Sequence, residues 1–305
     1  MNKGIKEKFS KTNGPKRILA LDGGGIRGAL TLGYLEKIEQ LLRKRYNDNN
    51  LVLADYYDLI GGTSTGSIIS ALLAVGKPVK DIVSMYQNLG KEVFGKRRYP
   101  VIPRSWTTFR AFFTSAYKGE IIEDLLKNNL GDITLCDYEK LKCPITIISK
   151  RADTFSLWTV ANHPDGVYTK AMSHLKLWEL CRASSAAPYY FPAKKLSLKT
   201  RQGENFDAAF IDGGISLANN PAIQLFLTAT IPSFGFDWAS GEENIFITSL
   251  GTGNGVNKDS VKDILSRKTL SWSPKLPELF MTDALEMNEV MMQILGKNYG
   301  DAEAI

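Results

Sequence analysis

A glycine-bounded turn between two apolar runs is the feature that most restricts the fold of this chain. Gly62-Thr63-Ser64-Thr65-Gly66 follows the run 57–61 and precedes the apolar run 67–74. This pattern predicts a buried strand, a tight turn and a helix, with Ser64 at the tip near the positive end of the helix. Ser64 is therefore a candidate nucleophile, and Gly62 and Gly66 are expected to leave room for a substrate carbonyl.

A second glycine cluster lies about forty residues upstream, directly after the short apolar run 17–21. It reads Asp22-Gly23-Gly24-Gly25-Ile26-Arg27-Gly28 and precedes a helical pattern with opposite apolar and polar faces. A glycine-rich loop that opens a helix exposes backbone N–H groups to an anion. Two anions fit. One is a pyrophosphate, because Gly23, Gly25 and Gly28 match the dinucleotide-binding pattern; the other is the oxyanion of an acyl-transfer intermediate.

An acidic residue at the end of a second strand, about twenty positions on, would favour the dinucleotide. Asp48 lies in a turn-like stretch, and Asp55 lies in the segment 54–57. Neither ends a convincing apolar strand. The oxyanion interpretation is therefore favoured, and a nucleotide-binding module that uses the glycine loop remains the alternative.

A nucleophilic serine needs a base, and the chain has only two histidines, His163 and His174. Both lie among turn formers or just before a helical stretch, so we expect surface or capping positions for them. The better candidate is Asp212, which follows the apolar strand 208–211 and precedes Gly213 and Gly214. A carboxylate is a weak base for a hydroxyl, so it would depend on burial and on a strong oxyanion hole.

Taken together, the three motifs in this order resemble the patatin-like phospholipase family of lipid acyl hydrolases. The stretches 55–61, 183–192 and 218–221 are similar to the same family, and the resemblance covers roughly residues 16–255. It implies a Ser64 nucleophile, an Asp212 base and an oxyanion hole lined by the residues Gly23, Gly24, Gly25 and Arg27. The remaining motif glycines are Gly28, Gly62, Gly66, Gly213 and Gly214.

The implied reaction is calcium-independent cleavage of fatty-acid esters of membrane lipids through an acyl-enzyme, of phospholipase A or lysophospholipase type. A neutral glyceride lipase or another esterase using the same site is the alternative within this class. No cofactor is expected, and no metal, since the sequence shows neither a dense His/Cys/Asp cluster nor the spacing of an EF-hand loop. The three cysteines lack paired spacing and read as free thiols.

Short apolar strands alternate with helical runs, which predicts an α/β fold. The resemblance makes this a three-layer sandwich with a central, mostly parallel sheet flanked by helices. We expect a basic N-terminal arm at 1–15 and a single acyl hydrolase domain at 16–305, of which 256–305 form a helical tail, because no linker or repeat divides the chain. The predicted strands are 18–21, 59–61, 144–149, 155–160, 208–211 and 245–250.

The chain carries a formal net charge of +6, and basic and aromatic residues are mixed in the segment 91–113. Such a mixture suits an anionic bilayer surface, so Lys96, Arg97, Arg98 and Trp106 are candidate membrane contacts. A local aromatic core beneath a solvated basic rim explains the segment equally well. No nucleic-acid partner is expected, because no base-reading module is recognisable.

Met1 to Arg17 lacks the apolar stretch of a signal peptide, so the expected location is cytoplasmic and peripheral at membranes. The expected partner is a lipid substrate at a membrane surface; a protein activator or a homo-oligomer is compatible with the sequence. In the tail, four methionines at helical spacing predict core packing, with a lid or partner surface as the alternative. They are Met281, Met287, Met291 and Met292.

Overall fold

The computed structural model describes residues 4–12, 14–89, 119–188, 190–200, 202–253, 259–272 and 275–297. Seven strands form one sheet in the order β5-β6-β3-β2-β1-β7, with β4 paired to β3 beside this path. The strands are β1 (Lys16–Leu21), β2 (Leu59–Thr63), β3 (Ile145–Arg151), β4 (Leu157–Ala161), β5 (Lys194–Lys199), β6 (Asn205–Asp212) and β7 (Ile245–Leu250).

Strand direction decides where the motifs meet. The neighbours β7, β1, β2 and β3 are parallel, whereas β4 and β6 run antiparallel to β3 and β5 runs antiparallel to β6. Most strands therefore share one direction. The interior strands β1 and β2 are almost wholly buried, as expected for parallel strands covered on both faces. The predicted α/β architecture with a central, mostly parallel sheet is confirmed.

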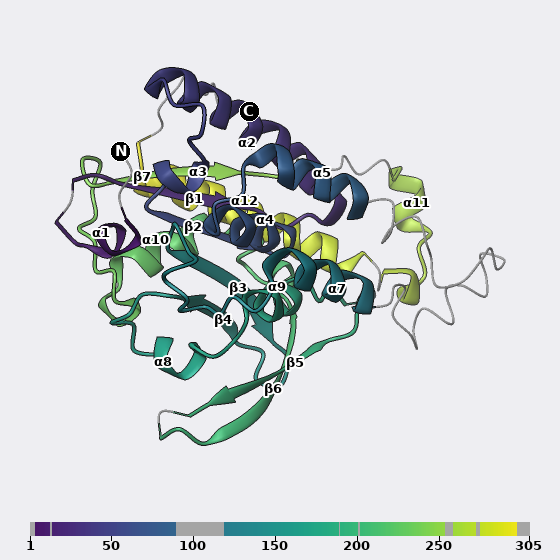
Figure 1. The fold of residues 1–305 in the computed structure, drawn as a ribbon. Helices are drawn as coiled ribbons and strands as arrows, with labels where there is room; N and C mark the ends of the chain where they lie inside the picture. The colour runs from purple at the N-terminus through teal and green to yellow at the C-terminus, as the bar shows by residue number, and fades with distance from the viewer. Residues whose placement is uncertain are drawn as a thin grey trace.

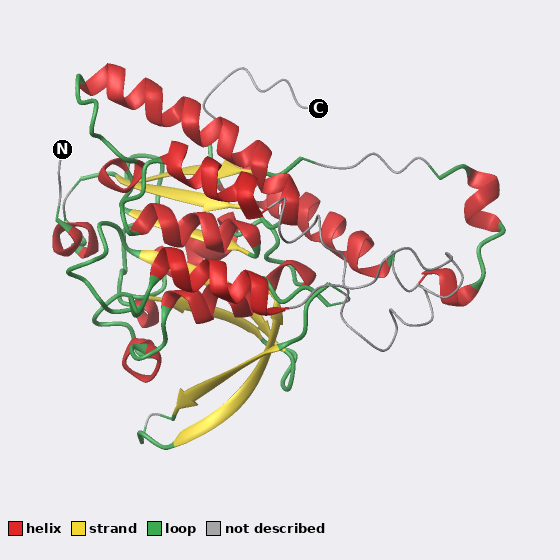
Figure 2. Ribbon diagram, turned by 45° about the vertical axis from the view of Figure 1, so that its right-hand side comes forward, coloured by secondary structure: helices red, strands yellow, loops and turns green. Residues whose placement is uncertain are grey.

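Helices cover both faces of this sheet (Figures 1 and 2). In Figure 1, α4, α5 and α9 lie in front of the strands and α12 lies behind them, where it packs on α10. The main helices are α2 (Gly28–Tyr46), α4 (Thr65–Ala74), α5 (Val79–Leu89), α7 (Gly119–Leu130), α9 (Leu177–Ser184), α10 (Ala222–Thr230) and α12 (Leu276–Leu295). Shorter ones are α1 (Ile5–Phe9), α3 (Leu53–Tyr56), α8 (Thr169–Met172) and α11 (Val261–Leu265).

The six predicted strands all exist, that at 245–250 with the predicted ends and the other five with shifted ends, and a seventh strand was missed. The strand β5 reads Lys-Lys-Leu-Ser-Leu-Lys, in which only Leu196 and Leu198 are buried. This alternation of period two is a strand signal, but lysines and serine mask it. The predicted strand at 155–160 starts two residues too early, because Phe155 has a positive φ of 55° and lies exposed in a turn.

The first residues of the chain pack against the main body. Within the predicted arm, α1 places Ile5 and Phe9 in the hydrophobic core. The Phe9 ring meets His163 edge-on at 4.8 Å between ring centroids. His163 is therefore buried between the rings of Phe9 and Phe236, and the expected surface position is wrong for it. Its Nδ1 accepts from the Asp165 N–H at 3.1 Å, as in the expected capping position. His174 is exposed, as expected.

The methionines of the tail do not share one environment. Met292 packs against the core, whereas Met287 and Met291 are exposed on the outer side of α12. The core-packing prediction therefore holds for only part of this stripe.

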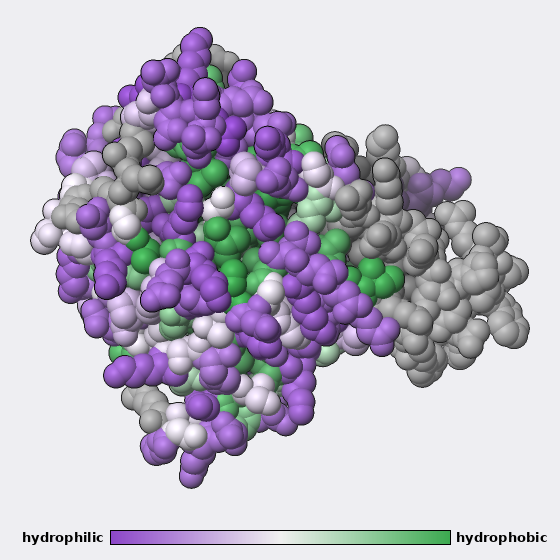
Figure 3. All heavy atoms as spheres, viewed as in Figure 1, coloured by the Kyte–Doolittle hydropathy of each residue, from purple (hydrophilic) through white to green (hydrophobic). Residues whose placement is uncertain are grey.

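In Figure 3, hydrophilic side chains cover most of the face seen in Figure 1, and hydrophobic ones gather towards its middle.

None of the helices within the described ranges is long and apolar enough to cross a membrane.

Candidate active site

Ser64 sits in a strained turn between β2 and α4. Its φ of 54° and ψ of −122° lie in a region that non-glycine residues rarely adopt, which matches the expected strand–turn–helix elbow. Two hydrogen bonds hold the turn: the Ser64 N–H donates to Ser184 Oγ at 2.8 Å, and Ser67 Oγ donates to the Ser64 carbonyl at 2.6 Å. The side chain is thus fixed at the edge of the sheet, at the start of a buried helix.

The two glycines of the turn serve close backbone packing. A Cβ atom on Gly62 would lie 2.3 Å from the Gly66 carbonyl group, and one on Gly66 would lie 2.1 Å from the Leu21 carbonyl oxygen. The expected role of these glycines was to make room for substrate, but the stronger requirement for glycine is the close approach of the backbone segments around them. They let α4 begin in contact with β1 and β2, which places Ser64 beside the glycine loop.

Asp212 reaches Ser64 because β6 enters the sheet against the direction of β3. The pairing of Asp212 with Ser149 places the last residue of β6 next to the end of β2. Ser64 Oγ donates to Asp212 Oδ2 at 2.5 Å, across 148 residues of chain. The other oxygen, Oδ1, accepts from the Gly214 N–H at 2.7 Å. Both carboxylate oxygens are therefore fixed, with one of them on the serine hydroxyl.

The raised pKa of Asp212 suits a base that accepts the proton of the Ser64 hydroxyl. Burial raises the pKa of this carboxyl from 3.8 to about 6, although the hydrogen bonds from Ser64 and Gly214 and the charge of Arg182 oppose the rise. The side chain is only 4% exposed. A carboxylate with a pKa near 6 accepts a proton more readily than an ordinary aspartate and is still ionised at neutral pH.

The glycine loop adjoins the same serine. A Cβ atom on Gly23 would lie 3.3 Å from Ser64 Cβ, so the loop passes directly beside the hydroxyl-bearing side chain. The Gly23 N–H donates to the Asn219 carbonyl at 3.0 Å and is therefore occupied. The N–H groups of Gly24 and Gly25 have no acceptor within the part of the chain that the structure describes. Those two amides are available to an anion.

A buried tyrosine connects the glycine loop to the serine turn. The Tyr86 hydroxyl from α5 donates to the Gly25 carbonyl and also contacts the Thr65 hydroxyl. A Cβ atom on Gly28 would lie 2.7 Å from this hydroxyl oxygen, which accounts for the glycine there. Sequence reasoning missed Tyr86, because a tyrosine on the apolar face of a helix reads as ordinary core.

Arg27 lies on the outer side of the loop. Its side chain is exposed, and its Nη1 donates to the Gly253 carbonyl at 2.9 Å, while its backbone N–H donates to the Gly24 carbonyl at 3.2 Å. In this arrangement Arg27 holds the loop. Ser184 and Thr252 are further residues whose contacts with this region the sequence did not reveal.

The structure brings together Ser64, Asp212, Gly214 and the loop from Gly23 to Gly25. The candidate membrane contacts Lys96, Arg97, Arg98 and Trp106 lie outside the described residues. Across the described residues, no group of three or more His, Cys, Asp and Glu side chains is arranged to hold a metal ion.

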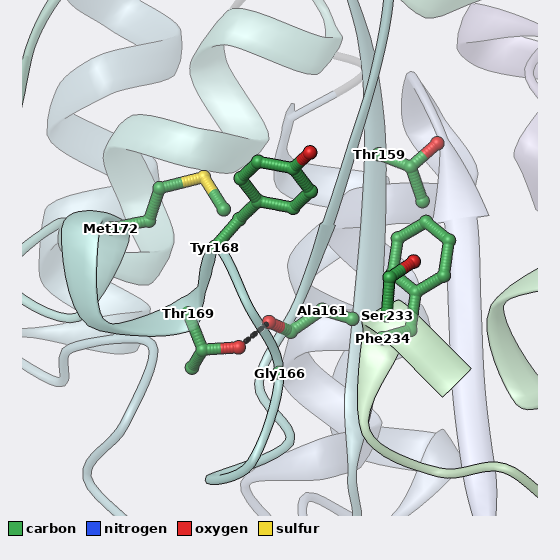
Figure 4. A pocket seen from close by; sticks show the side chains of 8 residues that line it. All are labelled: Thr159, Ala161, Gly166, Tyr168, Thr169, Met172, Ser233 and Phe234. Carbon is green, nitrogen blue, oxygen red and sulfur yellow. Dashed lines mark hydrogen bonds between the residues drawn. The ribbon is translucent and has the colours of Figure 1, made fainter. Parts of the chain in front are cut away.

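A small hollow between β4, α8 and the turn at Pro232–Phe234 lies away from these residues (Figure 4). Its walls include Tyr168, Met172 and Phe234, and the Thr169 hydroxyl donates to the Ala161 carbonyl at 3.3 Å. None of the candidate site residues lines it. Its position gives it no part in chemistry at Ser64.

The dinucleotide alternative loses support from the topology. The strand that follows the loop and its helix is β2, which ends at Thr63 and leads directly into Ser64 rather than into an acidic residue. Asp55 lies in α3, where its carboxylate accepts from the Val52 N–H at 3.0 Å. Among these elements, no Asp or Glu lies at the end of the second strand, where it would accept a hydrogen bond from a ribose hydroxyl.

Comparisons with known proteins find curated relatives of this chain. The chain is 27% identical to Patatin-2-Kuras 4 of Solanum tuberosum, covering 84% of this chain and 67% of that protein. Patatin group J-1 of the same plant is also 27% identical, with 84% and 65% covered. The chain thus spans about two thirds of the length of these curated relatives. VipD from Legionella pneumophila aligns with 90% of this chain and 67% of its own, at 14% identity and a TM-score of 0.37.

The family model described as patatin-like phospholipase matches residues 19–226. This range contains the glycine loop, the Ser64 turn and Asp212. Because the match takes in more than half of the sequence, this chain belongs to the patatin-like phospholipase family.

Proposed function

We propose that this protein is a calcium-independent lipid acyl hydrolase of phospholipase A or lysophospholipase type, acting through Ser64 and Asp212. Family membership supports a lipid acyl hydrolase. The observation that carries the finer proposal is the hydrogen bond from Ser64 Oγ to Asp212 Oδ2 at 2.5 Å, beside the Gly24 and Gly25 amides, which have no acceptor among the described residues. Ser64 is the nucleophile, Asp212 the base, and Gly24 and Gly25 the oxyanion donors.

The reaction has two steps that use the same groups. Asp212 takes the Ser64 proton as Oγ attacks the ester carbonyl, and the Gly24 and Gly25 N–H groups bind the oxyanion. Collapse breaks the ester bond, and Asp212 returns its proton to the departing lysolipid or alcohol. Water then attacks the acyl-serine, giving its proton to Asp212, and Ser64 leaves reprotonated as the fatty acid is released. Asp212 carries each proton and the two loop amides bind each oxyanion, so the proposal calls for no calcium.

In our proposal the substrate is an ester of a membrane lipid, and the enzyme binds it at an anionic membrane surface. The protein is cytoplasmic and peripheral in this view, with Lys96, Arg97, Arg98 and Trp106 as the proposed contacts. Neutralising the three cations should weaken binding to vesicles that contain anionic lipid. Unchanged vesicle binding would contradict the proposed membrane contacts, but it would not bear on the proposed reaction at Ser64 and Asp212.

The deciding experiment measures fatty-acid release from mixed phospholipid vesicles in the presence of a calcium chelator. We expect release by the wild type and none above background by Ser64→Ala or Asp212→Asn. Matched controls are Ser70→Ala, on the helix α4 that follows the nucleophile, and Asp207→Asn, an exposed acid on β6; both should keep wild-type rates. Activity that appears only after calcium is added would contradict the proposal.

Covalent labelling separates the hydrolase from a nucleotide-binding module. A fluorophosphonate should add its mass to Ser64 in the wild type, and Asp212→Asn should react more slowly. A parallel assay on a triglyceride emulsion separates a phospholipase from a neutral glyceride lipase. Absence of labelling together with tight nucleotide binding would favour the glycine loop as a phosphate site.

A further inference from the structure

A turn after the last strand of the sheet is hydrogen-bonded at each of its three residues, either to the glycine loop or to the helix α2 that follows the loop. Gly251, Thr252 and Gly253 follow β7, which lies parallel to β1, so the turn and the loop leave the sheet side by side. Thr31 Oγ1 donates to the Gly251 carbonyl at 2.9 Å, and Arg27 Nη1 donates to the Gly253 carbonyl at 2.9 Å. These two bonds hold the main chain of the turn.

The third bond differs because it comes from the turn and ends on the loop itself. Thr252 Oγ1 donates to the Gly23 carbonyl at 3.0 Å, and the Thr252 side chain is only 6% exposed. A Cβ atom on Gly24 would lie 2.1 Å from Thr252 Oγ1 and 2.5 Å from its Cβ. Thr252 therefore occupies the space that the missing side chain of Gly24 leaves open.

This contact fixes the direction of one amide. The Gly23 carbonyl and the Gly24 N–H belong to the same planar peptide unit and point in opposite directions. Fixing the carbonyl on Thr252 therefore turns the Gly24 N–H away from Thr252. Without the hydroxyl, this peptide is free to rotate, because glycine has almost no steric restriction on either side.

We propose that Thr252 is a positioning residue that orients the Gly24 N–H as an oxyanion donor. This inference rests on the proposed function, since it assigns the Gly24 amide to the oxyanion hole. Thr252 touches no reacting atom and acts through the peptide that it holds. The Tyr86 hydroxyl donates to the Gly25 carbonyl, so hydrogen bonds from Thr252 and from Tyr86 restrain two carbonyls of the loop.

We expect Thr252 to contribute to the rate of the chemical step and not to substrate binding. An oxyanion donor acts on charge that develops only in the transition state, and removal of one donor typically costs about 10²–10³-fold in kcat. A misdirected donor should cost less than a missing one. The expected signature is a lower kcat with an unchanged KM, whereas a weakened substrate site would raise KM. Because a loss of folded protein also lowers the apparent kcat at an unchanged KM, kcat is calculated per folded enzyme, measured by circular dichroism and gel filtration.

The test compares Thr252→Val, Thr252→Ser and Thr31→Val, using hydrolysis of a soluble short-chain ester. Valine keeps the shape of threonine without the donor, serine keeps the donor, and Thr31→Val removes a hydrogen bond to the same turn without touching the loop peptide. We expect kcat of Thr252→Val to fall about 10- to 100-fold, with KM within about two-fold of the wild type. Thr252→Ser and Thr31→Val should stay within about three-fold in kcat.

A crystal structure of Thr252→Val gives a second readout that needs no activity. The Gly23–Gly24 peptide should be rotated or disordered, and it should be unchanged in Thr31→Val. Three results would overturn the inference: equal losses of kcat in Thr252→Val and Thr31→Val, no rescue by serine, or an unmoved peptide in Thr252→Val. An inactive wild type that fluorophosphonate does not label would count against the proposed function instead, while the crystal structure would still decide the peptide's dependence on Thr252.

Discussion

The Ser64 N–H donates a hydrogen bond to Ser184 Oγ at 2.8 Å, and the same Ser184 hydroxyl donates onward to the Ile148 carbonyl. Ser184 is the last residue of α9 and is wholly buried. The strained backbone of Ser64 is thus tied to β3 through a side chain that lies 120 residues away in the sequence.

Ser184→Ala should destabilise the protein, because it leaves the buried Ser64 N–H without an acceptor. An unsatisfied buried group costs about 1–3 kcal/mol, and chemical denaturation should show a loss in the free energy of unfolding within that range. The matched control is Ser185→Ala, whose hydroxyl bonds back to carbonyls of the preceding helical turn, those of Cys181 at 2.8 Å and Arg182 at 3.4 Å. Its loss should be smaller; equal losses would mean that the Ser64 peptide does not depend on Ser184.

The pH dependence of hydrolysis should report the pKa of Asp212. Burial raises this pKa from 3.8 to about 6, and the protonated acid cannot accept the serine proton. We therefore expect kcat/KM on a soluble ester to be level above about pH 7 and to fall about ten-fold per pH unit below about pH 6. Enzyme returned to neutral pH should recover full activity. An acid limb near pH 4 would show that burial does not raise the pKa of the base above the ordinary aspartate value of 3.8.

Gly66 should not tolerate a side chain, because a Cβ atom there meets the Leu21 carbonyl oxygen at 2.1 Å. Neither partner is the flexible end of a side chain, so α4 would have to move away from β1. We expect Gly66→Ala to lose about 3 kcal/mol or more in the free energy of unfolding, or to fail to fold. Gly33→Ala is the control, since Gly33 lies exposed within α2 with nothing near its Cβ position. It should gain about 0.5–1 kcal/mol.

The buried Asp22 should make stability depend on pH. Burial, aided by the charge of Glu289, raises its pKa from 3.8 to about 8, so the folded state holds a proton that the unfolded state has released. The wild type should therefore lose stability as pH rises from about 4 to about 8, at up to about 1.4 kcal/mol per pH unit.

Asp22→Asn removes this titration. The melting temperature of the variant minus that of the wild type should increase between pH 5 and pH 8 and become level above about pH 8. A difference that stays constant across this range would show that Asp22 is ionised in the folded protein at neutral pH.

Local patterns in the amino-acid sequence predict the strands that carry chemistry and the motifs at their ends. Apolar runs before Asp22, Ser64 and Asp212 predicted buried strands, and all three exist. These signals are local, because strand propensity, glycine turns and helix starts depend on residues within a few positions of one another. For the same reason the strand β5 was missed, since its lysines hide the alternation of its two buried leucines.

Which groups meet, and which contacts hold each of them, depends on the packing of the whole fold. Asp212 lies next to Ser64 because β6 runs antiparallel to β3, a choice that no local pattern encodes. The burial that raises the pKa of Asp212 likewise comes from distant segments. The hydrogen bonds from Tyr86 and Thr252 to the loop carbonyls join positions 61 and 229 residues apart. Such contacts depend on the packing of whole elements, which periodicity and spacing in a single sequence do not specify.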